Sequence, residues 1–470
     1  MVRSTLGVVL MVGVLLVASA CADGVGQTAL SVTVTSHEDG VTVLGDRNVQ
    51  IIGTVVGASA VTVSSAAANV PASVSDGTFE ATLRLDDGAN DLVVTASRGS
   101  ESVTVTLELV YPFLDLSPFP VADVVIGGLR DDVDQSVSAT SVAGPYSTAA
   151  SDGGRLYLGD FEAQRVLVFD SFPEADGAAA AVVLGQPDFT SSGAGLGPAS
   201  FNGVAGVAAA DGHLFVPDRA NHRVMVWTSP PTENGAAADF ALGQDDLDSA
   251  ASGCSVDRFL EPNDVAVAGG RLLVADNFNR RVLVWNTLPT SPSALPDLVL
   301  GQVDFDTCDA AGATAFGSIL SVWADETRVL VADYANHRVL QWSTFPTSNG
   351  VPPDVVLGQS DFETTTASTT AAGLSNPHGV TSNGNQIFVT DTANHRVLVW
   401  DAFPTTSGVA ADRVIGQSSF DLGAENDTNQ DGSPGPGVSA ATMAWPYFGT
   451  IVDGALVVSD YDNGRYLVFR

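Results

Sequence analysis

Lysine is absent from the 470-residue chain: all 19 basic residues are arginine, whereas 54 residues are acidic, 43 of them aspartate. The resulting formal charge of -35 would repel a phosphate backbone, which argues against nucleic acid as a partner. Only 16% of the residues are charged and 45% are hydrophobic, which argues against a disordered chain. The composition therefore predicts a folded, strongly acidic protein.

Long apolar runs are also scarce, and the run at the N-terminus is short. It extends from Leu6 to Val17, behind the single charge of Arg3, and falls below the roughly 20 residues that span a bilayer. We therefore interpret residues 1–20 as a secretory signal peptide. No later segment is apolar enough to span a bilayer.

The end of this signal resembles a bacterial lipoprotein box, because Ala18-Ser19-Ala20 stands directly before Cys21. It departs from the usual box in having Ala18 in place of Leu. The resemblance implies lipidation of Cys21 and an exported, lipid-anchored protein of the cell envelope, at the outer membrane or cell surface. Membrane contact would then be limited to the anchor. The alternative is a plain secreted protein cleaved at the same small residues.

Residues 28–110 are rich in Val and Thr and alternate between apolar and polar positions. Turn sequences such as 38–40, 75–77 and 86–90 separate the short segments. This pattern predicts an antiparallel β-sandwich. The run DGTFEATLRLDDGANDLVVTA (76–96) resembles bacterial Ig-like modules, which implies a spacer or an adhesion module. Residues 111–120, YPFLDLSPFP, are predicted to be a linker.

The remainder, residues 121–470, is built from two recurring units. A three-strand unit carries an aspartate, called here the anchor Asp, at steps of 58, 58, 57, 58 and 69 residues: Asp160, Asp218, Asp276, Asp333, Asp391 and Asp460. A Gly-Gln type strand recurs around glycines 127, 185, 243, 301, 358 and 416. Such a long period with four strands per repeat is typical of a β-propeller.

The order of the two units predicts how the propeller closes. The first Gly-Gln type strand, at 123–128, precedes every three-strand unit, and the last three-strand unit ends at Arg470. Pairing of 123–128 with 465–469 would leave no exposed edge. We therefore predict an all-β protein: an Ig-like β-sandwich followed by a six-bladed β-propeller closed between its N- and C-terminal strands.

The sequences DRANHRVMVW (218–227) and DTANHRVLVW (391–400) resemble NHL repeats. The resemblance extends over 121–470 and implies a six-bladed propeller. It weakens in the first unit, which has Glu162-Ala163-Gln164, and in the last, which has Gly464. The recurring Asp, Asn and Arg residues, and the turn histidines His222, His337 and His395, are interpreted as architectural because they recur around the whole ring.

Residues that differ between repeats are better candidates for function. The turns entering the innermost strands line one mouth of a propeller channel. The candidate ligand-binding residues in these turns are Tyr146, Asn202, Asn263, Ser318, His378 and Tyr447. The resembling fold also includes zinc-dependent amidating lyases and lactonases. A catalytic zinc needs three protein ligands, typically several His, and only His378 is at a mouth position.

The longer step before Asp460 contains a candidate calcium loop. Asp427, Asn429 and Asp431 alternate before Gly432, and Ser433 could add a backbone carbonyl. Alternate oxygen ligands around a Gly bend suit Ca²⁺. Val438 occupies the position where an EF-hand has its bidentate Glu. A solvated Asp/Asn/Gly loop is the equal alternative.

Cys254 and Cys308 follow two successive Gly-Gln strands in matching loops. In an oxidising compartment this predicts a disulfide between blades.

Taken together, the sequence predicts an exported binding scaffold whose partner is a protein, a glycan or a small molecule. A metal-assisted lyase or lactone hydrolase and a purely structural envelope protein are the alternatives.

Overall fold

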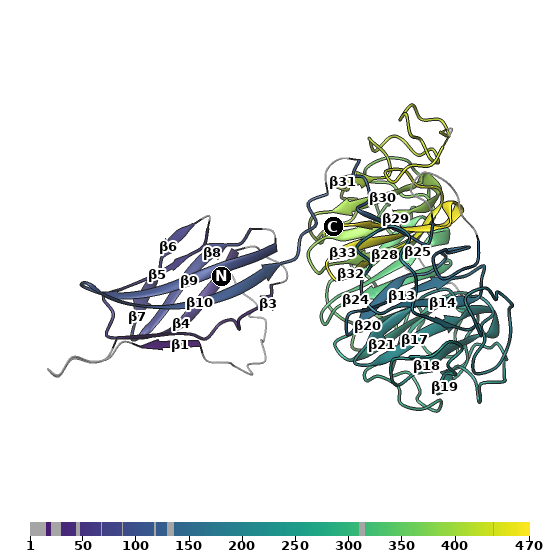
Figure 1. Ribbon diagram of the computed structural model, residues 1–470, viewed down its shortest axis with the longest axis horizontal. Helices are drawn as coiled ribbons and strands as arrows, with labels where there is room; N and C mark the ends of the chain where they lie inside the picture. Colours follow the sequence, from purple (N-terminus) through teal and green to yellow (C-terminus); the bar gives the residue numbers. More distant parts are fainter. Residues whose placement is uncertain are drawn as a thin grey trace. The chain divides into compact units, whose positions relative to one another are not determined.

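The computed structural model describes residues 16–19, 30–43, 48–66, 68–86, 88–116, 119–128, 136–309, 315–435 and 437–470. Cys21 and most of the predicted signal peptide lie outside the described residues. The chain divides into two compact units, Met1–Asp115 and Leu116–Arg470 (Figure 1). The division falls inside the predicted linker 111–120.

The first unit contains two five-stranded sheets in its described part. One has the order β1-β2-β4-β8-β7, with bounds β1 Leu16–Ser19, β2 Ser31–Val34, β4 Asn48–Val56, β8 Thr78–Arg84 and β7 Ser73–Ser75. The other has the order β3-β10-β9-β5-β6, with bounds β3 Val41–Thr42, β10 Glu101–Tyr111, β9 Gly88–Arg98, β5 Ala60–Ser64 and β6 Asn69–Pro71.

The two sheets share one hydrophobic core, to which Ile51 and Phe79 contribute from the first sheet and Val63 and Leu92 from the second. Burial in β4 and β8 alternates residue by residue, because a strand with one face on the core and one in water has a side-chain period of two. β10 continues through Tyr111, so the predicted linker begins one residue too early. β1 lies within the predicted signal peptide and pairs with β2.

The described residues of the second unit form six four-stranded antiparallel sheets. Five of them are continuous in sequence: β12 Ala149–Asp152 to β15 Val182–Leu184, β16 Ala208–Ala210 to β19 Phe240–Leu242, β20 Pro262–Ala268 to β23 Leu298–Leu300, β24 Ile319–Ala324 to β27 Val355–Leu357, and β28 Pro377–Ser382 to β31 Arg413–Ile415. Between these outer members lie β13 Arg155–Asp160, β14 Arg165–Phe169, β17 His213–Asp218, β18 Arg223–Trp227, β21 Arg271–Asp276, β22 Arg281–Trp285, β25 Val329–Asp333, β26 Arg338–Trp342, β29 Ile387–Asp391 and β30 Arg396–Trp400.

The sixth sheet joins the two ends of this unit. β11 (Val124–Ile126) pairs antiparallel with β34 (Arg465–Phe469), Val124 opposite Val468 and Ile126 opposite Tyr466. β33 (Ala455–Asp460) and β32 (Pro446–Val452) complete the sheet. The predicted pairing of the leading strand with the last strand is therefore confirmed.

The first strands of the sheets contact one another in a closed circle, in the order β12, β16, β20, β24, β28, β32 and back to β12. Hydrophobic side chains fill the layers between neighbouring sheets, so the circle encloses a central channel lined by first strands. The described helices are the short 3₁₀ turns η1 Arg219–Asn221, η2 Tyr334–Asn336, η3 Thr392–Asn394 and η4 Tyr461–Asn463. No helix in the described part of the chain has the length and hydropathy needed to span a bilayer.

Candidate functional site

The anchor Asp residues fix the loops that lead into the first strands. Each anchor carboxylate is buried, and its Oδ2 accepts the Nε–H of the Arg five residues later at 2.7–2.9 Å. Its Oδ1 accepts backbone N–H groups from the preceding loop: those of Gly144, Asn202, Leu260, Gly317, Ser375 and Ala444. The predicted architectural role is what these contacts provide, because they hold the loops that form one mouth of the channel.

The arginines that pair with the anchor Asp residues also hydrogen-bond neighbouring loops. In the fifth sheet, Arg396 donates Nη1–H to the carbonyl of Phe420 and Nη2–H to the carbonyl of Thr370, at 2.9 Å for the latter. The side chain is fully buried. One guanidinium therefore joins its own turn, the loop before the sheet and the loop after it.

The turn histidines link neighbouring sheets. His222, His337 and His395 are left-handed, with φ of 55°, 53° and 52°. Each Nδ1 accepts a backbone N–H of the next sheet's loop, for example Trp445 to His395 at 3.0 Å. In the first sheet, Gln164 is left-handed in the same way and its Oε1 accepts the N–H of Gly203. Burial lowers the pKa of His395 to about 4, which keeps Nδ1 free to accept.

Three of the six predicted mouth residues meet in one aromatic cluster. The ring centroids of Tyr146 and Tyr447 are 4.7 Å apart, those of His378 and Tyr447 are 4.3 Å apart, and those of Tyr146 and His378 are 5.9 Å apart. Tyr334 approaches His378 to 4.6 Å, and Tyr461 approaches Tyr447 to 4.7 Å. These five residues, called here the mouth cluster, contain four of the seven tyrosines in the chain, so tyrosine is concentrated at this mouth.

The other three predicted mouth residues have different surroundings. The backbone N–H of Asn202 bonds the anchor Asp218 at 2.6 Å. Ser318 donates its hydroxyl to Oδ1 of Asn277 at 2.7 Å. Asn263 is fully buried and donates its Nδ2–H to the carbonyl of Leu320 at 2.7 Å. The side chain of Asn263 also hydrogen-bonds Tyr146, so Asn263 adjoins the mouth cluster.

The residues that directly follow the anchor Asp were not among the mouth residues predicted from the sequence. Tyr334 and Tyr461 occupy this position and belong to the mouth cluster. Arg219 occupies it in the second sheet, where it forms an ion pair with Glu261 at 2.8 Å. The signal was available, because this position varies between repeats whereas the Asn and Arg around it recur.

Tyr146, Tyr447, Tyr461 and His378 of the mouth cluster are uncharged at neutral pH. Burial raises the pKa of Tyr146 and of Tyr447 to about 12, and burial together with the hydrogen bond to Glu162 raises the pKa of Tyr461 above its ordinary value. Burial lowers the pKa of His378 to about 3, so its imidazole is neutral. The cluster therefore offers aromatic faces and neutral hydrogen-bonding groups, beside the Arg219–Glu261 ion pair.

Comparison with known proteins adds one family. Residues 374–400 match the NHL repeat. This NHL repeat covers the loop before β28, the anchor Asp391 and the Arg396 strand, and so includes His378 of the mouth cluster. No curated protein matches the sequence.

Among solved structures, the chain is similar to the nidogen/laminin complex, with a TM-score of 0.38 and 10% identity over 66% of this chain and 85% of that chain. It is similar to the PQQ-bound aldose sugar dehydrogenase of Streptomyces coelicolor, with a TM-score of 0.39 and 13% identity over 72% and 97%. It is also similar to the glutaminyl cyclase of Myxococcus xanthus, with a TM-score of 0.32 and 11% identity over 57% and 89%.

The candidate calcium loop follows the NHL match in sequence. Asp427 is fully buried, and its carboxylate accepts the N–H groups of Asp431 at 3.1 Å and Gly432 at 2.8 Å. Asp431 is bonded to Asn429 and to the N–H of Ser433. The carboxylates thus brace the turn of the loop itself. No group of three or more His, Cys, Asp or Glu side chains in the described chain is arranged to hold a metal ion.

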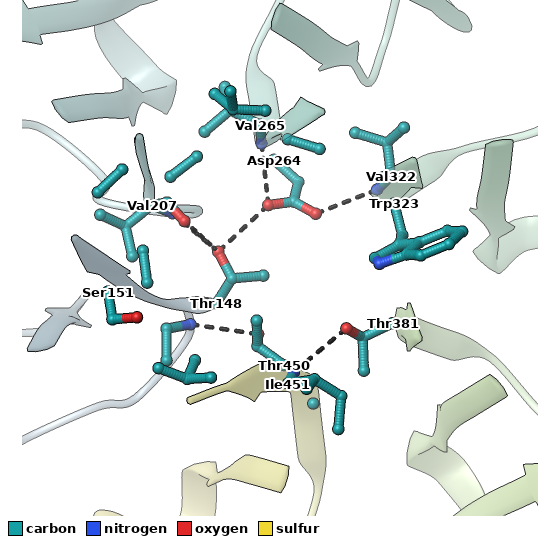
Figure 2. A pocket seen from close by; sticks show the side chains of 18 of the residues that line it. Thr148, Ser151, Val207, Asp264, Val265, Val322, Trp323, Thr381, Thr450 and Ile451 are labelled. Carbon is teal, nitrogen blue, oxygen red and sulfur yellow. Dashed lines mark hydrogen bonds between the residues drawn. The ribbon is translucent and has the colours of Figure 1, made fainter. Parts of the chain in front are cut away.

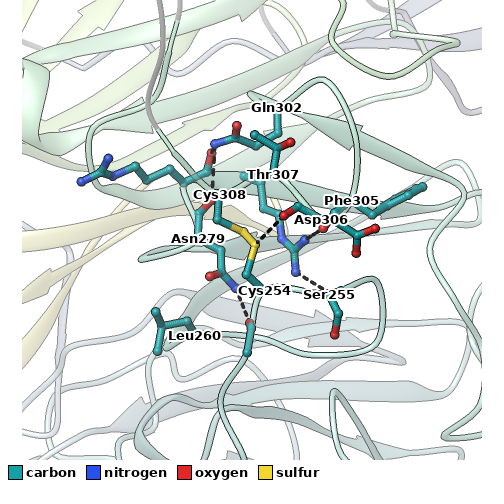
Figure 3. Close-up of a disulfide and its surroundings, with 12 residues drawn as sticks. Cys254, Ser255, Leu260, Asn279, Gln302, Phe305, Asp306, Thr307 and Cys308 are labelled. Carbon is teal, nitrogen blue, oxygen red and sulfur yellow. Dashed lines mark hydrogen bonds between the residues drawn. A yellow bond between two sulfur atoms is a disulfide. The ribbon is translucent and has the colours of Figure 1, made fainter.

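Cys254 and Cys308 are joined by a disulfide, with Cα atoms 6.3 Å apart (Figure 3). The bridge lies beside the buried Arg281, whose guanidinium donates to the carbonyls of Ser255 and Phe305. The disulfide and Arg281 therefore hold the same two loops, one before β20 and one after β23.

Proposed function

We propose that this protein is an exported envelope lipoprotein, anchored at Cys21, whose second unit is a six-bladed NHL-type propeller presented on an Ig-like spacer. The propeller acts as a binding scaffold, and the mouth cluster is its ligand site. The four-stranded sheets, their closed circle of first strands and the NHL match support the propeller. We also propose that the 427–433 loop binds calcium, as a structural ion that is independent of the ligand site.

The observation that carries the binding proposal is a pair of buried polar atoms at the mouth. Nε of Arg219 and Oδ1 of Asn263 have no hydrogen-bond partner among the described residues. The side chain of Asn263 hydrogen-bonds Tyr146, and Arg219 and Asn263 both lower the pKa of the Tyr146 hydroxyl, so these unpaired atoms lie beside the mouth cluster. An unpaired buried polar atom costs about 1–3 kcal/mol, so a ligand that accepts from Arg219 and donates to Asn263 would recover that energy on binding.

The chemistry of the mouth favours a neutral glycan over an anionic ligand. Uncharged tyrosine faces suit stacking against an apolar sugar face, and a sugar hydroxyl can both donate and accept. The chain's charge of -35 opposes the approach of an anion. A protein partner or another small ligand would use the same cluster, and no observation on the described residues favours the lyase or lactone hydrolase.

A glycan array tests this proposal directly. The mature chain should bind neutral oligosaccharides, and Tyr447→Ala should weaken the best of them at least about tenfold, because it removes one face of the cluster. Leu295→Ala is the matched control: Leu295 is 53% exposed and outside the mouth cluster, so its removal should leave binding unchanged. Equal binding by the wild type and Tyr447→Ala would contradict the proposal, as would a wild type that binds only anionic glycans.

A further inference from the structure

The central channel holds a cavity of about 230 Å³ that is separate from the mouth cluster (Figure 2). All six first strands contribute to its lining, and no residue of the mouth cluster is among the lining residues. The volume is below the roughly 300–1,000 Å³ of pockets for drug-sized ligands. The occupant of this cavity would therefore be small.

The sequence explains why there is space in the channel. The residues ten positions before the anchor Asp residues all line the cavity: Ala150, Ala208, Ala266, Trp323, Thr381 and Thr450. Three successive sheets thus place alanine where the others have Trp or Thr. These alanines fill less of the lining than a Trp or Thr at the same position would.

A single acidic residue is buried in this cavity wall. The residues twelve positions before the anchors are Thr148, Gly206, Asp264, Ser321, Gly379 and Phe448, so Asp264 is the exception in its layer. It is 1% exposed and lines the cavity. Gly206 makes room for it, because a Cβ on Gly206 would lie 2.5 Å from Oδ1 of Asp264.

The hydrogen bonds of Asp264 leave one oxygen incompletely used. Oδ2 accepts from the hydroxyl of Ser321 at 2.8 Å and from the N–H of Val322 at 3.1 Å. Oδ1 accepts from the N–H of Val265 at 2.9 Å. It also accepts from the hydroxyl of Thr148, at the longer distance of 3.3 Å.

Thr148 has two possible acceptors for its hydroxyl proton, Asp264 and the carbonyl of Val207. Its hydroxyl has one proton, and the carbonyl of Val207 is nearer to it, at 3.1 Å, than Asp264 is. Oδ1 of Asp264 therefore retains an acceptor site next to the cavity. No ion pair involves Asp264 in the part of the chain that the structure describes. Burial without a countercharge raises the pKa of Asp264 to about 7.

We propose that the channel cavity binds a small aliphatic ammonium ion, with its N–H on Oδ1 of Asp264 and its alkyl chain against the alanine side of the cavity. An ammonium group supplies the missing hydrogen bond and the missing positive charge together. Ala150, Ala208 and Val207 supply an apolar wall. Trp323 also lines the cavity (Figure 2), and its ring packs against Phe403 with the ring centroids 5.8 Å apart.

A metal ion fits this cavity less well than an amine. Calcium takes six to eight oxygen ligands, whereas Asp264 and Asp453 are the only carboxylates in the described lining. Asp453 is bonded to the hydroxyl of Ser151 at 2.8 Å, at the other end of the first strands. A bare metal ion cannot make hydrophobic contacts with the apolar wall, whereas the alkyl chain of an alkylammonium can.

Isothermal titration calorimetry of the full chain with n-butylammonium tests the proposal. The wild type should show saturable binding, n-butanol and butyrate should show none, and Asp264→Asn should weaken n-butylammonium at least about tenfold. Asp453→Asn is the matched control, because it removes a carboxylate from the same cavity without touching Asp264, and it should bind as the wild type does.

A second variant guards against misfolding of Asp264→Asn. Ala266→Leu reduces the cavity while leaving every contact of Asp264 in place, and larger residues already stand at this position in three other sheets. It should lose n-butylammonium binding with an unchanged thermal transition. The proposal is overturned if the wild type does not bind, if Asp453→Asn rather than Asp264→Asn abolishes binding, or if K⁺ or Ca²⁺ binds through Asp264 and the amine does not. The mouth cluster is not involved, so glycan binding and amine binding can fail independently.

Discussion

Replacing Ile126 with alanine tests whether one strand closes the whole six-sheet unit. Ile126 is fully buried between β34 and the first sheet, in a core that includes Tyr466, Val142 and Leu158. Truncating a buried isoleucine costs about 2–5 kcal/mol, which is a large part of the roughly 5–15 kcal/mol that stabilises a typical domain. If the sheets unfold as one unit, the free energy of unfolding of all of them should fall by that amount.

Urea unfolding followed by tryptophan fluorescence reports on this unit alone. All six tryptophans lie within it and none lies in Met1–Asp115: Trp227, Trp285, Trp323, Trp342, Trp400 and Trp445. Four of them end third strands of sheets other than the one that β11 completes. A shift of the whole fluorescence transition would therefore show that truncating Ile126 in β11 destabilises distant sheets.

Val121→Ala is the matched control for Ile126→Ala. Val121 is 61% exposed, so its truncation should change the free energy of unfolding by no more than about 0.5 kcal/mol. Unfolding of the six sheets as one unit is contradicted if Ile126→Ala leaves the fluorescence transition where the wild type has it. It is also contradicted if the transition splits, because the sheet of β11 would then unfold without the others.

Four further expectations can be checked with single variants or simple chemistry. Arg396→Ala should lower the free energy of unfolding by about 3–5 kcal/mol, because it leaves Asp391 buried and unpaired. In the same denaturation assay the control Arg258→Ala should lower it by no more than about 1 kcal/mol, because the acidic partners of Arg258 are half-exposed or more. Because the pKa of His395 is lower in the folded chain than in the unfolded chain, the wild type should lose stability as the pH falls from about 6.5 towards 4. His395→Gln copies Gln164 of the first sheet and should keep the hydrogen bond to Trp445. Its stability should therefore change less with pH than that of the wild type. Reducing the Cys254–Cys308 bridge, with its sequence separation of 54, should lower stability by about 2–4 kcal/mol, and full alkylation of both thiols without reductant would show that no bridge forms. Mass spectrometry of the mature N-terminus should find a lipid-modified Cys21, and an unmodified Cys21 or cleavage elsewhere would contradict the anchor.

The repeat architecture could be predicted from the sequence because the same pattern of residues recurs six times. The anchor Asp, its Arg and the Gly-Gln strand recur at nearly constant steps, and a circular offset of one strand has one sensible pairing, which β11 and β34 adopt. Single short strands such as β3 and β7 were not predicted, because two or three residues carry no periodicity.

The site was predictable only in part, for a physical reason. Tyr146, His378 and Tyr447 were found because the turns entering the innermost strands face one mouth. Tyr334 and Tyr461 were missed because the residue after the anchor Asp was interpreted as part of a structural turn. Asp264 was missed because it lies within a strand, and strand periodicity does not tell which residues approach the channel.

Selective ¹³C labelling of tyrosine offers the most direct test of binding at the mouth, since the chain has only seven tyrosines. NMR spectra would be recorded while the neutral oligosaccharide with the strongest array signal is added to the mature chain, with resonances assigned by Tyr→Phe variants. We expect saturable shifts for Tyr146, Tyr334, Tyr447 and Tyr461, and unchanged resonances for Tyr111, Tyr157 and Tyr466. Shifts confined to these last three tyrosines, or no shift at saturating oligosaccharide, would contradict a ligand site at the mouth cluster.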